Sequence, residues 1–259
     1  MKLHLTPAVA LCVFLSACAT QPPATGPAAA TAAKVPAADA GPALHGMFER
    51  YFEDVLRLNP LLLLSPSDRS LFVLGATGVI PIDSYQRWWT LVSAGYLHGG
   101  LLHIFFNMAA FRQLSAVVVR EFGIRRMFAI YALGSVAGFG ASYLAGISLT
   151  IGASAGVCGL VGAIMYFGKS RGGAYGTALY KQVGMWVVIM FVFGFAVPGI
   201  NNWGHAGGIG AGALLGYLLG YTERKRETAV HQKLAILCLA GTAGILAWAI
   251  ITSLYYRLL

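Results

Sequence analysis

The chain has 259 residues, of which 58% are hydrophobic and only 10% are charged, and its mean hydropathy is +0.70. These values argue against a soluble globular domain, because long apolar runs with few charges are typical of a polytopic membrane protein. The 18 Lys and Arg residues exceed the 9 acids and give a net charge of +9. They are scattered between the apolar runs without interleaved aromatic residues, so no nucleic-acid-binding surface is predicted. The composition therefore predicts an all-α bundle of membrane helices.

Residues 1–18 have the pattern of a secretory signal, with Lys2 near the start and an apolar region over 5–15. That region is too short for a transmembrane helix, which needs about 17 to 25 residues. The segment ends in the sequence LSAC, which resembles the lipobox of bacterial lipoproteins and predicts lipidation of Cys18. A plain signal peptide and an uncleaved short anchor are the alternatives.

The next segments have no membrane-length apolar run. Residues 19–45 are rich in Ala, Pro and Thr and predict a disordered tether. Over 46–66, apolar residues recur at helical spacing between charged ones, which predicts an amphipathic helix at the membrane surface. In the outside loop that follows, the Arg-Trp-Trp run at 87–89 suits the lipid headgroup region. The expected organisation is a signal segment (1–18), a linker (19–45), an amphipathic helix with an outside loop (46–93), a core (94–222) and an additional C-terminal transmembrane helix (223–259).

Six apolar runs are candidate spans, and they cover residues 94–111, 127–146, 151–168, 183–200, 204–221 and 234–256. The connections after the first, third and fifth spans are basic, whereas the hairpins near 147–150 and 201–203 carry no charge. Because basic loops stay in the cytoplasm, the first span is expected to enter from outside. Residues 19–93 then lie on the outer, periplasmic side, where either an exported signal or an uncleaved anchor would leave them.

Two polar residues stand out within this frame. Ser154 and His205 each follow an uncharged outside hairpin and begin a helix that runs inward, so they are expected at similar depth on parallel helices. Polar or ionisable groups at membrane depth are functional-site candidates by default. A serine hydroxyl and a histidine imidazole are the nucleophile and the base that acyl transfer requires. The pair therefore predicts a candidate site for acyl transfer, provided that the two helices pack together.

Small residues recur every fourth position below both of these side chains, as Gly208, Gly212, Gly216 and Gly220 below His205, and as Cys158 and Gly162 below Ser154. Small residues at this spacing let two helix backbones approach closely in lipid. The pattern indicates helix packing in the first place. Close packing is also what a hydrogen bond between Ser154 and His205 requires.

The first span contains three further polar residues, His98, His103 and Asn107. The last two are four residues apart and share a helix face. Donors aimed at one point can stabilise the oxyanion of a tetrahedral intermediate, whereas an isolated residue such as His98 is more often a packing hydrogen bond. Metal binding is the competing interpretation, but histidines without an intramembrane carboxylate are a weak ligand set. The spacing of the four cysteines fits neither a disulfide framework nor a zinc site.

Several motifs occur together in a fixed order: Arg-Trp-Trp at 87–89, the span with His98, His103 and Asn107, Gly152-Ala153-Ser154, and Asn202-Trp203-Gly204-His205 followed by Gly208 and Gly212. As a set they resemble the rhomboid family of intramembrane serine proteases. The resemblance covers about residues 60–222. Taken alone, the GxS and HxxxN patterns are weak signals, and the specificity comes from the set.

The resemblance implies that Ser154 is the nucleophile and His205 the general base, without a third triad member. It also implies an oxyanion hole formed by His103, Asn107 and the backbone N–H of Ser154, with His98, Gly152 and Gly208 in supporting positions. The reaction would be acylation of Ser154 by a peptide carbonyl followed by hydrolysis. The implied substrates are transmembrane proteins whose helix unwinds easily and has a small residue before the cut. The resemblance implies a multi-pass protein of the bacterial inner membrane, in contact with the lipid bilayer and without a cofactor or a metal; oligomeric state is not specified.

The chain departs from the family pattern at three places. Ala155 follows the nucleophile where the family usually has Gly, and Cys158 stands where an aromatic residue often packs on the catalytic histidine. Cys158 is expected to face the histidine helix and, being small, to hold His205 less firmly, so that an aromatic residue would fit there if the space is open. The alternative is that a larger neighbour, Trp203 or Met165, fills the space of the missing ring. The usual first span is also absent. The alternatives are a catalytically silent rhomboid-like protein that binds or escorts membrane proteins, and a transporter or channel, which would have polar groups through the full membrane depth.

Overall fold

The computed structural model of the protein describes residues 65–196 and 199–258. The predicted signal segment with Cys18, the linker and all but the last two residues of the predicted amphipathic segment lie outside the described residues, so these assignments stay predictions. Within the described ranges every named element is a helix, and the one extended pairing is an isolated antiparallel bridge between Thr77 and Thr150. The prediction of an all-α architecture is confirmed.

Four short elements form a cap at one end of the bundle: α3 (Asp68–Leu74), η3 (Ile80–Ser84), α4 (Thr90–Ser93) and η4 (Ala94–Tyr96). Ser67 starts α3 because its side chain accepts a hydrogen bond from the Ser70 N–H, and Gly75 ends the helix in the left-handed conformation at φ 112°. Arg87 donates to the carbonyl oxygens of Phe72 and Val73, at 2.6 and 3.1 Å. The arginine of the predicted headgroup motif therefore also holds the cap together.

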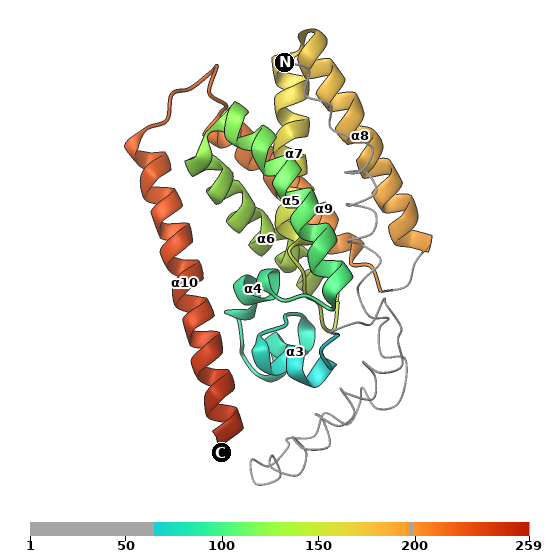
Figure 1. The fold of residues 1–259 in the computed structure, drawn as a ribbon, viewed down its shortest axis with the longest axis vertical. Helices are drawn as coiled ribbons and strands as arrows, with labels where there is room; N and C mark the ends of the chain where they lie inside the picture. Colours follow the sequence, from blue (N-terminus) through green and yellow to red (C-terminus); the bar gives the residue numbers. More distant parts are fainter. Residues whose placement is uncertain (1–64, 197–198, 259) are drawn as a thin grey trace.

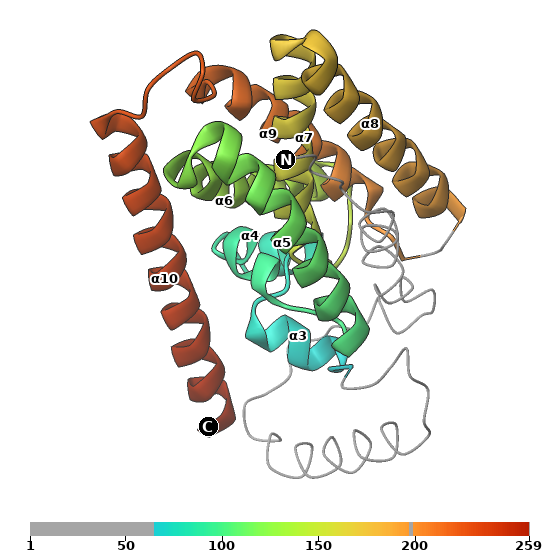
Figure 2. The same cartoon turned by 45° about the horizontal axis from the view of Figure 1, so that its top comes forward.

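Six long helices follow: α5 (Leu101–Phe122), α6 (Ile124–Leu144), α7 (Ser154–Arg171), α8 (Gly173–Ala196), α9 (Asn202–Leu219) and α10 (Ala229–Leu258). Each overlaps one of the predicted spans. Among the described residues, four of these helices, α5, α6, α8 and α10, are long and apolar enough to cross a membrane. The other two, α7 and α9, are richer in glycine; α7 is largely buried in the bundle, whereas α9 buries one face against α7 and α6 (Figures 1 and 2).

The start of the first predicted span was wrong. Residues 94–96 form the separate turn η4, and α5 begins only at Leu101. The pair Gly99-Gly100 separates the two elements, because glycine is a poor helix former. His98 consequently lies in the connection before α5 and not within a spanning helix.

The bundle is built around α7, which packs against α5, α6, α8 and α9. Its apolar residues are buried all round, as expected for a central helix. The contact between α7 and α9 is backbone against backbone: a methyl group added to Gly212 would lie 1.8 Å from the Gly159 carbonyl oxygen, and one added to Gly208 would lie 2.3 Å from that of Ala155. The predicted close approach of these two helices is therefore present.

The contact surface of α7 is wider than the predicted row of Ser154, Cys158 and Gly162. The glycines of α9 meet Ala155, Gly159 and Ala163, each one position after the predicted series of Ser154, Cys158 and Gly162. Gly162 instead packs against Ile209 of α9. At the other end, Gly220 lies outside the contact and ends α9 with a positive φ of 72°. Ser154 and Cys158 also face α9, at His205 and Gly208, so two neighbouring rows of α7 form the contact, the predicted row and the one beside it.

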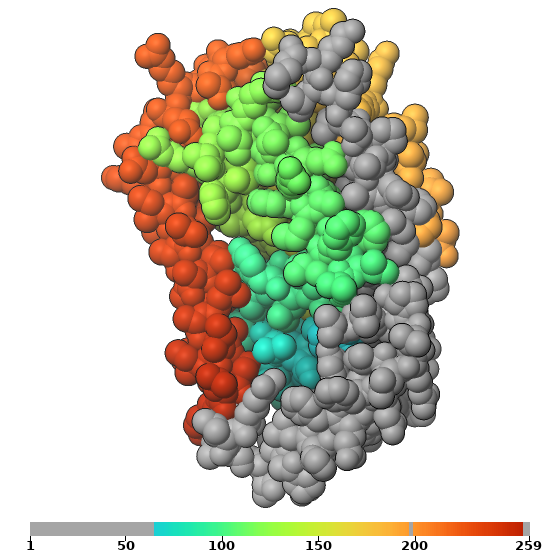
Figure 3. Space-filling view, in the orientation of Figure 1, coloured from blue at the N-terminus to red at the C-terminus, as the bar shows by residue number. Residues whose placement is uncertain are grey.

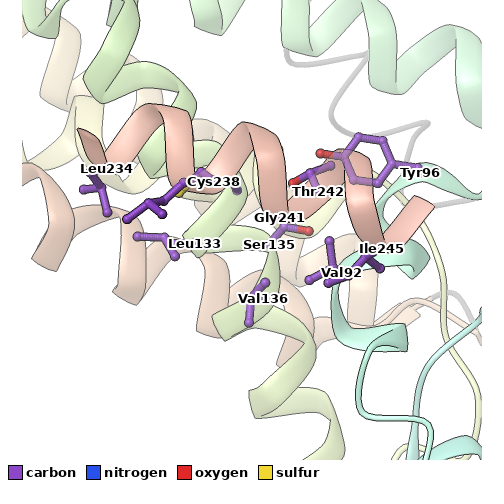
Figure 4. Close-up of a pocket in the computed structure, with 12 residues that line it drawn as sticks. Val92, Tyr96, Leu133, Ser135, Val136, Leu234, Cys238, Gly241, Thr242 and Ile245 are labelled. Carbon is purple, nitrogen blue, oxygen red and sulfur yellow. The ribbon is translucent and has the colours of Figure 1, made fainter. Parts of the chain in front are cut away.

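The C-terminal helix α10 stands on one flank, along α6, α4 and α3 (Figures 1 and 2). Ser253 ties its far end to α3 by donating to the Val73 carbonyl oxygen at 3.0 Å. A cavity of about 270 Å³ separates α10 from α6 and the α4–η4 segment, and the space-filling view shows the hollow beside this helix (Figure 3). Most of its lining is apolar, but Ser135, Tyr96 and Thr242 also contribute, and Figure 4 shows Tyr96 and Thr242 together at one end.

At the end of the bundle that carries the basic connections, Arg126 is fully buried and joins two segments far apart in sequence. Its guanidinium donates to the carbonyl oxygens of Phe122 and Lys225, at 3.0 and 2.6 Å. Beside it, Arg125 pairs with Glu227 at 3.3 Å. These contacts fix the segment between α9 and α10 on the α5–α6 connection.

Candidate active site

Ser154 is the first residue of α7, and the turn before it is held in place by backbone contacts. Gly152 adopts a φ of 122°, which an L side chain rarely tolerates, and its N–H donates to the Ala94 carbonyl oxygen at 2.9 Å. Two residues earlier, Thr150 exchanges two backbone hydrogen bonds with Thr77, of 2.7 and 3.1 Å. The turn is thereby fixed to the cap, and it presents Ser154 at the helix start.

His205 lies one turn into α9 and is only 4% exposed. Its Nε2 atom is 3.1 Å from the Oγ atom of Ser154. This distance suits a hydrogen bond donated by the hydroxyl to Nε2, with the imidazole proton on Nδ1. Nδ1 itself has no hydrogen-bond partner among the described residues. The structure thus brings the predicted nucleophile and base together without a third side chain behind the imidazole.

His103 is fully buried on α5 beside the same turn. Its Nδ1 accepts a hydrogen bond from the Gly99 N–H at 3.2 Å, so a neutral ring carries its proton on Nε2. Nε2 has no partner among the described residues. It lies 3.0 Å from the point where a Cβ of Gly152 would be, and the Ser154 Oγ lies 3.7 Å from that same point. The imidazole therefore has a free N–H close to the nucleophile.

Asn107 is also buried and lies one turn further along α5. Its Nδ2 donates to the His103 carbonyl oxygen at 3.0 Å, which uses one of its two N–H bonds, while Oδ1 has no partner within the described ranges. Asn107 and His103 share a helix face, as their spacing predicts. A second amide N–H of Asn107 is available to a group bound beside His103.

His98 supports these residues from the connection before α5. Its ring packs edge-to-face on the ring of His103, with centroids 5.2 Å apart. Gly208 lies where the helices α7 and α9 touch, and Gly152 lies under the His103 ring. A side chain at either position would collide with these neighbours. The three residues expected in supporting positions all lie around Ser154, His205 and His103.

Cys158 is buried between two helices. Its Cβ contacts the backbone of α9 at Gly208, as expected, but its sulfur points to α8 and lies 3.8 Å from the sulfur of Met190. Met190 therefore fills the space that was assigned to Trp203 or Met165, and Trp203 is 59% exposed. The sequence did not reveal this contact because α8 has no periodic feature that identifies which of its residues faces α7.

Replacement of Cys158 by Ala is expected to keep activity within about tenfold of the native protein, roughly 1.4 kcal/mol of barrier, because a buried thiol in apolar surroundings is inert. An aromatic residue was expected to fit if the space were open. The space is closed by Met190 and Gly208, so Cys158→Tyr should instead lower the thermal unfolding midpoint by overpacking. Turnover and thermal unfolding of both variants check this. Total loss of turnover in a folded Cys158→Ala protein would contradict it.

Asn201 was not among the site residues predicted from the sequence. Asn201 precedes α9, and its side chain makes three hydrogen bonds, to Ser142, to Thr150 and to the N–H of Gly204. An Asn directly before an apolar run is a recognisable N-cap signal. The partners on two other segments could not be found from the local sequence.

Comparison with known proteins places this arrangement in a family. Residues 85–222 match the Rhomboid domain, and the chain belongs to the rhomboid family. It is similar to RHOMBOID-like protein 4 of Arabidopsis thaliana, with 32% identity over 63% of this chain and 41% of that protein. It is likewise similar to Rhomboid protease GluP of Bacillus subtilis (strain 168), with 30% identity over 63% of this chain and 32% of that protein.

A third relative, RHOMBOID-like protein 5 of Arabidopsis thaliana, is 33% identical over 61% of this chain and 52% of its own length. The chain thus spans about a third to a half of the curated relatives named here. The residues that match the Rhomboid domain include α4, η4, α5 and the two glycine-rich helices, which carry the candidate site. With its apolar helices, this membership makes the chain a multi-pass membrane protein.

Proposed function

We propose that the chain is an intramembrane serine endopeptidase that cleaves transmembrane segments of other membrane proteins. The observation that carries the proposal is the buried contact of 3.1 Å between Ser154 Oγ and His205 Nε2, beside the free N–H of His103. A hydroxyl that donates to an imidazole nitrogen is an activated nucleophile. One of the relatives, Rhomboid protease GluP, is named as a protease. Within the described residues, no group of three or more His, Cys, Asp or Glu residues is placed to hold a metal ion.

In the proposed mechanism, Ser154 Oγ attacks a substrate peptide carbonyl while His205 Nε2 takes the hydroxyl proton. His205 then gives this proton to the leaving amine, and an acyl-enzyme on Ser154 remains. Water, deprotonated by His205, hydrolyses the ester and restores the hydroxyl. Among the described residues the imidazole has no carboxylate behind it, so its position relative to Ser154 depends on helix packing.

The negative oxygen of the tetrahedral intermediate needs hydrogen-bond donors that are already in position when the charge develops. The Nε2–H of His103, the free amide N–H of Asn107 and the backbone N–H of Ser154 are the proposed oxyanion hole. The backbone donor is at the start of α7, where helix N–H groups have no intrahelical partner. These three donors come from two helices whose relative position the cap holds.

Replacement of either His103 or Asn107 by alanine is expected to lower turnover on the order of 10²- to 10³-fold, because a single oxyanion donor contributes that much in related chemistry. Ser154 should still react with a fluorophosphonate, at a reduced rate, since the nucleophile and base are intact. Turnover numbers and labelling rates of the single and double variants measure the effect. Normal turnover in the double variant would reduce both residues to a packing role.

We further propose a location in the bacterial inner membrane, with residues 19–93 on the periplasmic side. The basic connections support this orientation, because it keeps them in the cytoplasm. The proposed substrates are transmembrane proteins whose helix unwinds readily and has a small residue before the cut. The lipid bilayer is the only other partner proposed.

The test uses the full chain in lipid vesicles with a transmembrane substrate that has a central Ala-Gly segment. Mass spectrometry of the products is expected to reveal a cut inside the apolar segment, after a small residue. Fluorophosphonate labelling of the same sample separates a protease from a silent rhomboid-like protein, since only an activated serine reacts. If the chain shows no cleavage and no labelling, the proposal is overturned in favour of the silent alternative.

A further inference from the structure

The imidazole of His205 lacks the partner that usually orients a catalytic histidine. In serine hydrolases with a triad, a carboxylate accepts the Nδ1 proton and holds the ring. Here Nδ1 is buried and has no partner among the described residues. The orientation of His205 must therefore come from the placement of its backbone, that is, from whatever fixes the first turn of α9.

Asn201 is the residue that fixes this turn. As the N-cap of α9, its Oδ1 accepts a hydrogen bond from the Gly204 N–H at 2.9 Å, and its carbonyl oxygen accepts from the His205 N–H at 3.2 Å. Its amide group donates both protons outside the helix, to Ser142 Oγ at 2.7 Å and to Thr150 Oγ1 at 2.9 Å. The three side-chain hydrogen bonds of Asn201 thus reach α9, α6 and the Thr150 turn, whereas capping requires only the bond within α9.

The two partners of Asn201 outside α9, Ser142 and Thr150, lie on segments that contact the surroundings of Ser154. Thr150 is two residues before Gly152, in the turn that is bridged to Thr77 and that presents Ser154. Ser142 donates to the Gly138 carbonyl oxygen at 3.0 Å. A methyl group on Gly138 would lie 2.6 Å from the Gly204 carbonyl oxygen and 2.9 Å from the Ala155 Cβ, so this part of α6 is wedged between α7 and α9. Asn201 consequently joins the start of the histidine helix to the turn before the nucleophile.

We propose that Asn201 is a positioning residue, which sets the separation of Ser154 and His205 by coupling the first turn of α9 to the Thr150 turn and to α6. It takes over the orienting role of a third triad member, through the backbone and not through the imidazole. This inference rests on the proposed protease function, because it concerns the geometry of the same pair.

Two substitutions separate positioning from capping. Asn201→Ser keeps a good N-cap acceptor but is too short to reach Ser142 and Thr150, whereas Asn201→Ala removes all three hydrogen bonds. Both variants are expected to lower kcat by about 10- to 100-fold with KM within about twofold, because a displacement near 1 Å at reacting groups has effects of this size. The rate of Ser154 phosphonylation per folded molecule should fall in parallel.

The partner side is tested at Thr150. Thr150→Val removes the hydroxyl and keeps the shape, so kcat should fall about as far as it does in Asn201→Ser. Thr150→Ser keeps the hydroxyl and should restore most of the lost rate. In the double variant Asn201→Ser, Thr150→Val the loss should be much smaller than the product of the single losses, since both changes break the same bond.

A matched control is Ser67→Ala. This change removes the side chain that caps the N-terminus of α3, one of the four short helices at the end of the bundle. It should lower the thermal unfolding midpoint and leave kcat per folded molecule unchanged. If Asn201→Ser behaves in the same way, or keeps native kcat, the residue is only a cap and the inference is overturned. If the native chain neither cleaves nor labels, the proposed function itself fails. If the native chain is labelled, Ser154→Ala is not, and the Asn201 variants keep native kcat, then the positioning role is refuted while the proposed function stands.

Discussion

Replacement of either Ser154 or His205 by alanine is expected to abolish cleavage of a transmembrane substrate, with turnover reduced on the order of 10⁴-fold or more. Ser154→Ala removes the atom that forms the acyl bond. His205→Ala removes the base 3.1 Å away, and no other described side chain hydrogen-bonds to the hydroxyl of Ser154 to replace it. Because the two groups act as one unit, the double variant should be no worse than either single one.

The measurement is cleavage in lipid vesicles together with fluorophosphonate labelling of the intact chain. Ser135→Ala and His231→Ala are matched controls, since both side chains are buried in α6 and α10, away from the dyad. These controls should cleave at close to the native rate. Retained cleavage in Ser154→Ala or His205→Ala would refute the assignment of the nucleophile or of the base.

The second large effect is expected at Gly212, in the contact between α7 and α9. A methyl group there would lie 1.8 Å from the carbonyl oxygen of Gly159, and a backbone atom cannot move aside as a side chain can. Gly212→Ala should force the helices apart, with a loss of about 3 kcal/mol or more, at the upper end of overpacking effects. Since His205 lies on the displaced helix, activity should fall at least 10²-fold in the molecules that remain folded.

Gly210→Ala supplies the control on the same helix, because a Cβ at Gly210 meets no atom within 4 Å. It should leave thermal unfolding and activity at native values, as alanine is a better helix former than glycine. Thermal unfolding in detergent and the rate of Ser154 labelling measure both variants. Equal behaviour of Gly210→Ala and Gly212→Ala would show that the two helices are not in the tight contact described.

Local and periodic signals in the sequence predict much of this fold. The apolar runs identified the long helices, and the four-residue spacing put His103 and Asn107 on one face. Predictions of this kind are correct because they depend only on residues within one helix. The predicted start of the first span failed at Gly99-Gly100, since an average over an apolar window does not detect a break within it.

What the sequence could not provide depends on how two or more segments meet. The contact between α7 and α9 uses a second row on α7, Ala155, Gly159 and Ala163, beside the predicted one. The contact of Cys158 with Met190, and the bonds from Asn201 to Ser142 and Thr150, join residues between 32 and 59 positions apart. No local pattern encodes such a pairing, because each partner alone is an ordinary residue of its helix or turn.

The glycine contact between α7 and α9 has a consequence for motion. Side chains in an ordinary interface exchange rotamers on picosecond to nanosecond timescales, and each exchange shifts the spacing of the elements that they separate. Glycine has no rotamers, so at Gly159 and Gly212 this source of fluctuation is absent. The distance between the two helices then behaves like a fixed length set by backbone atoms alone. In exchange, this contact has almost none of the tolerance to substitution that larger apolar cores retain.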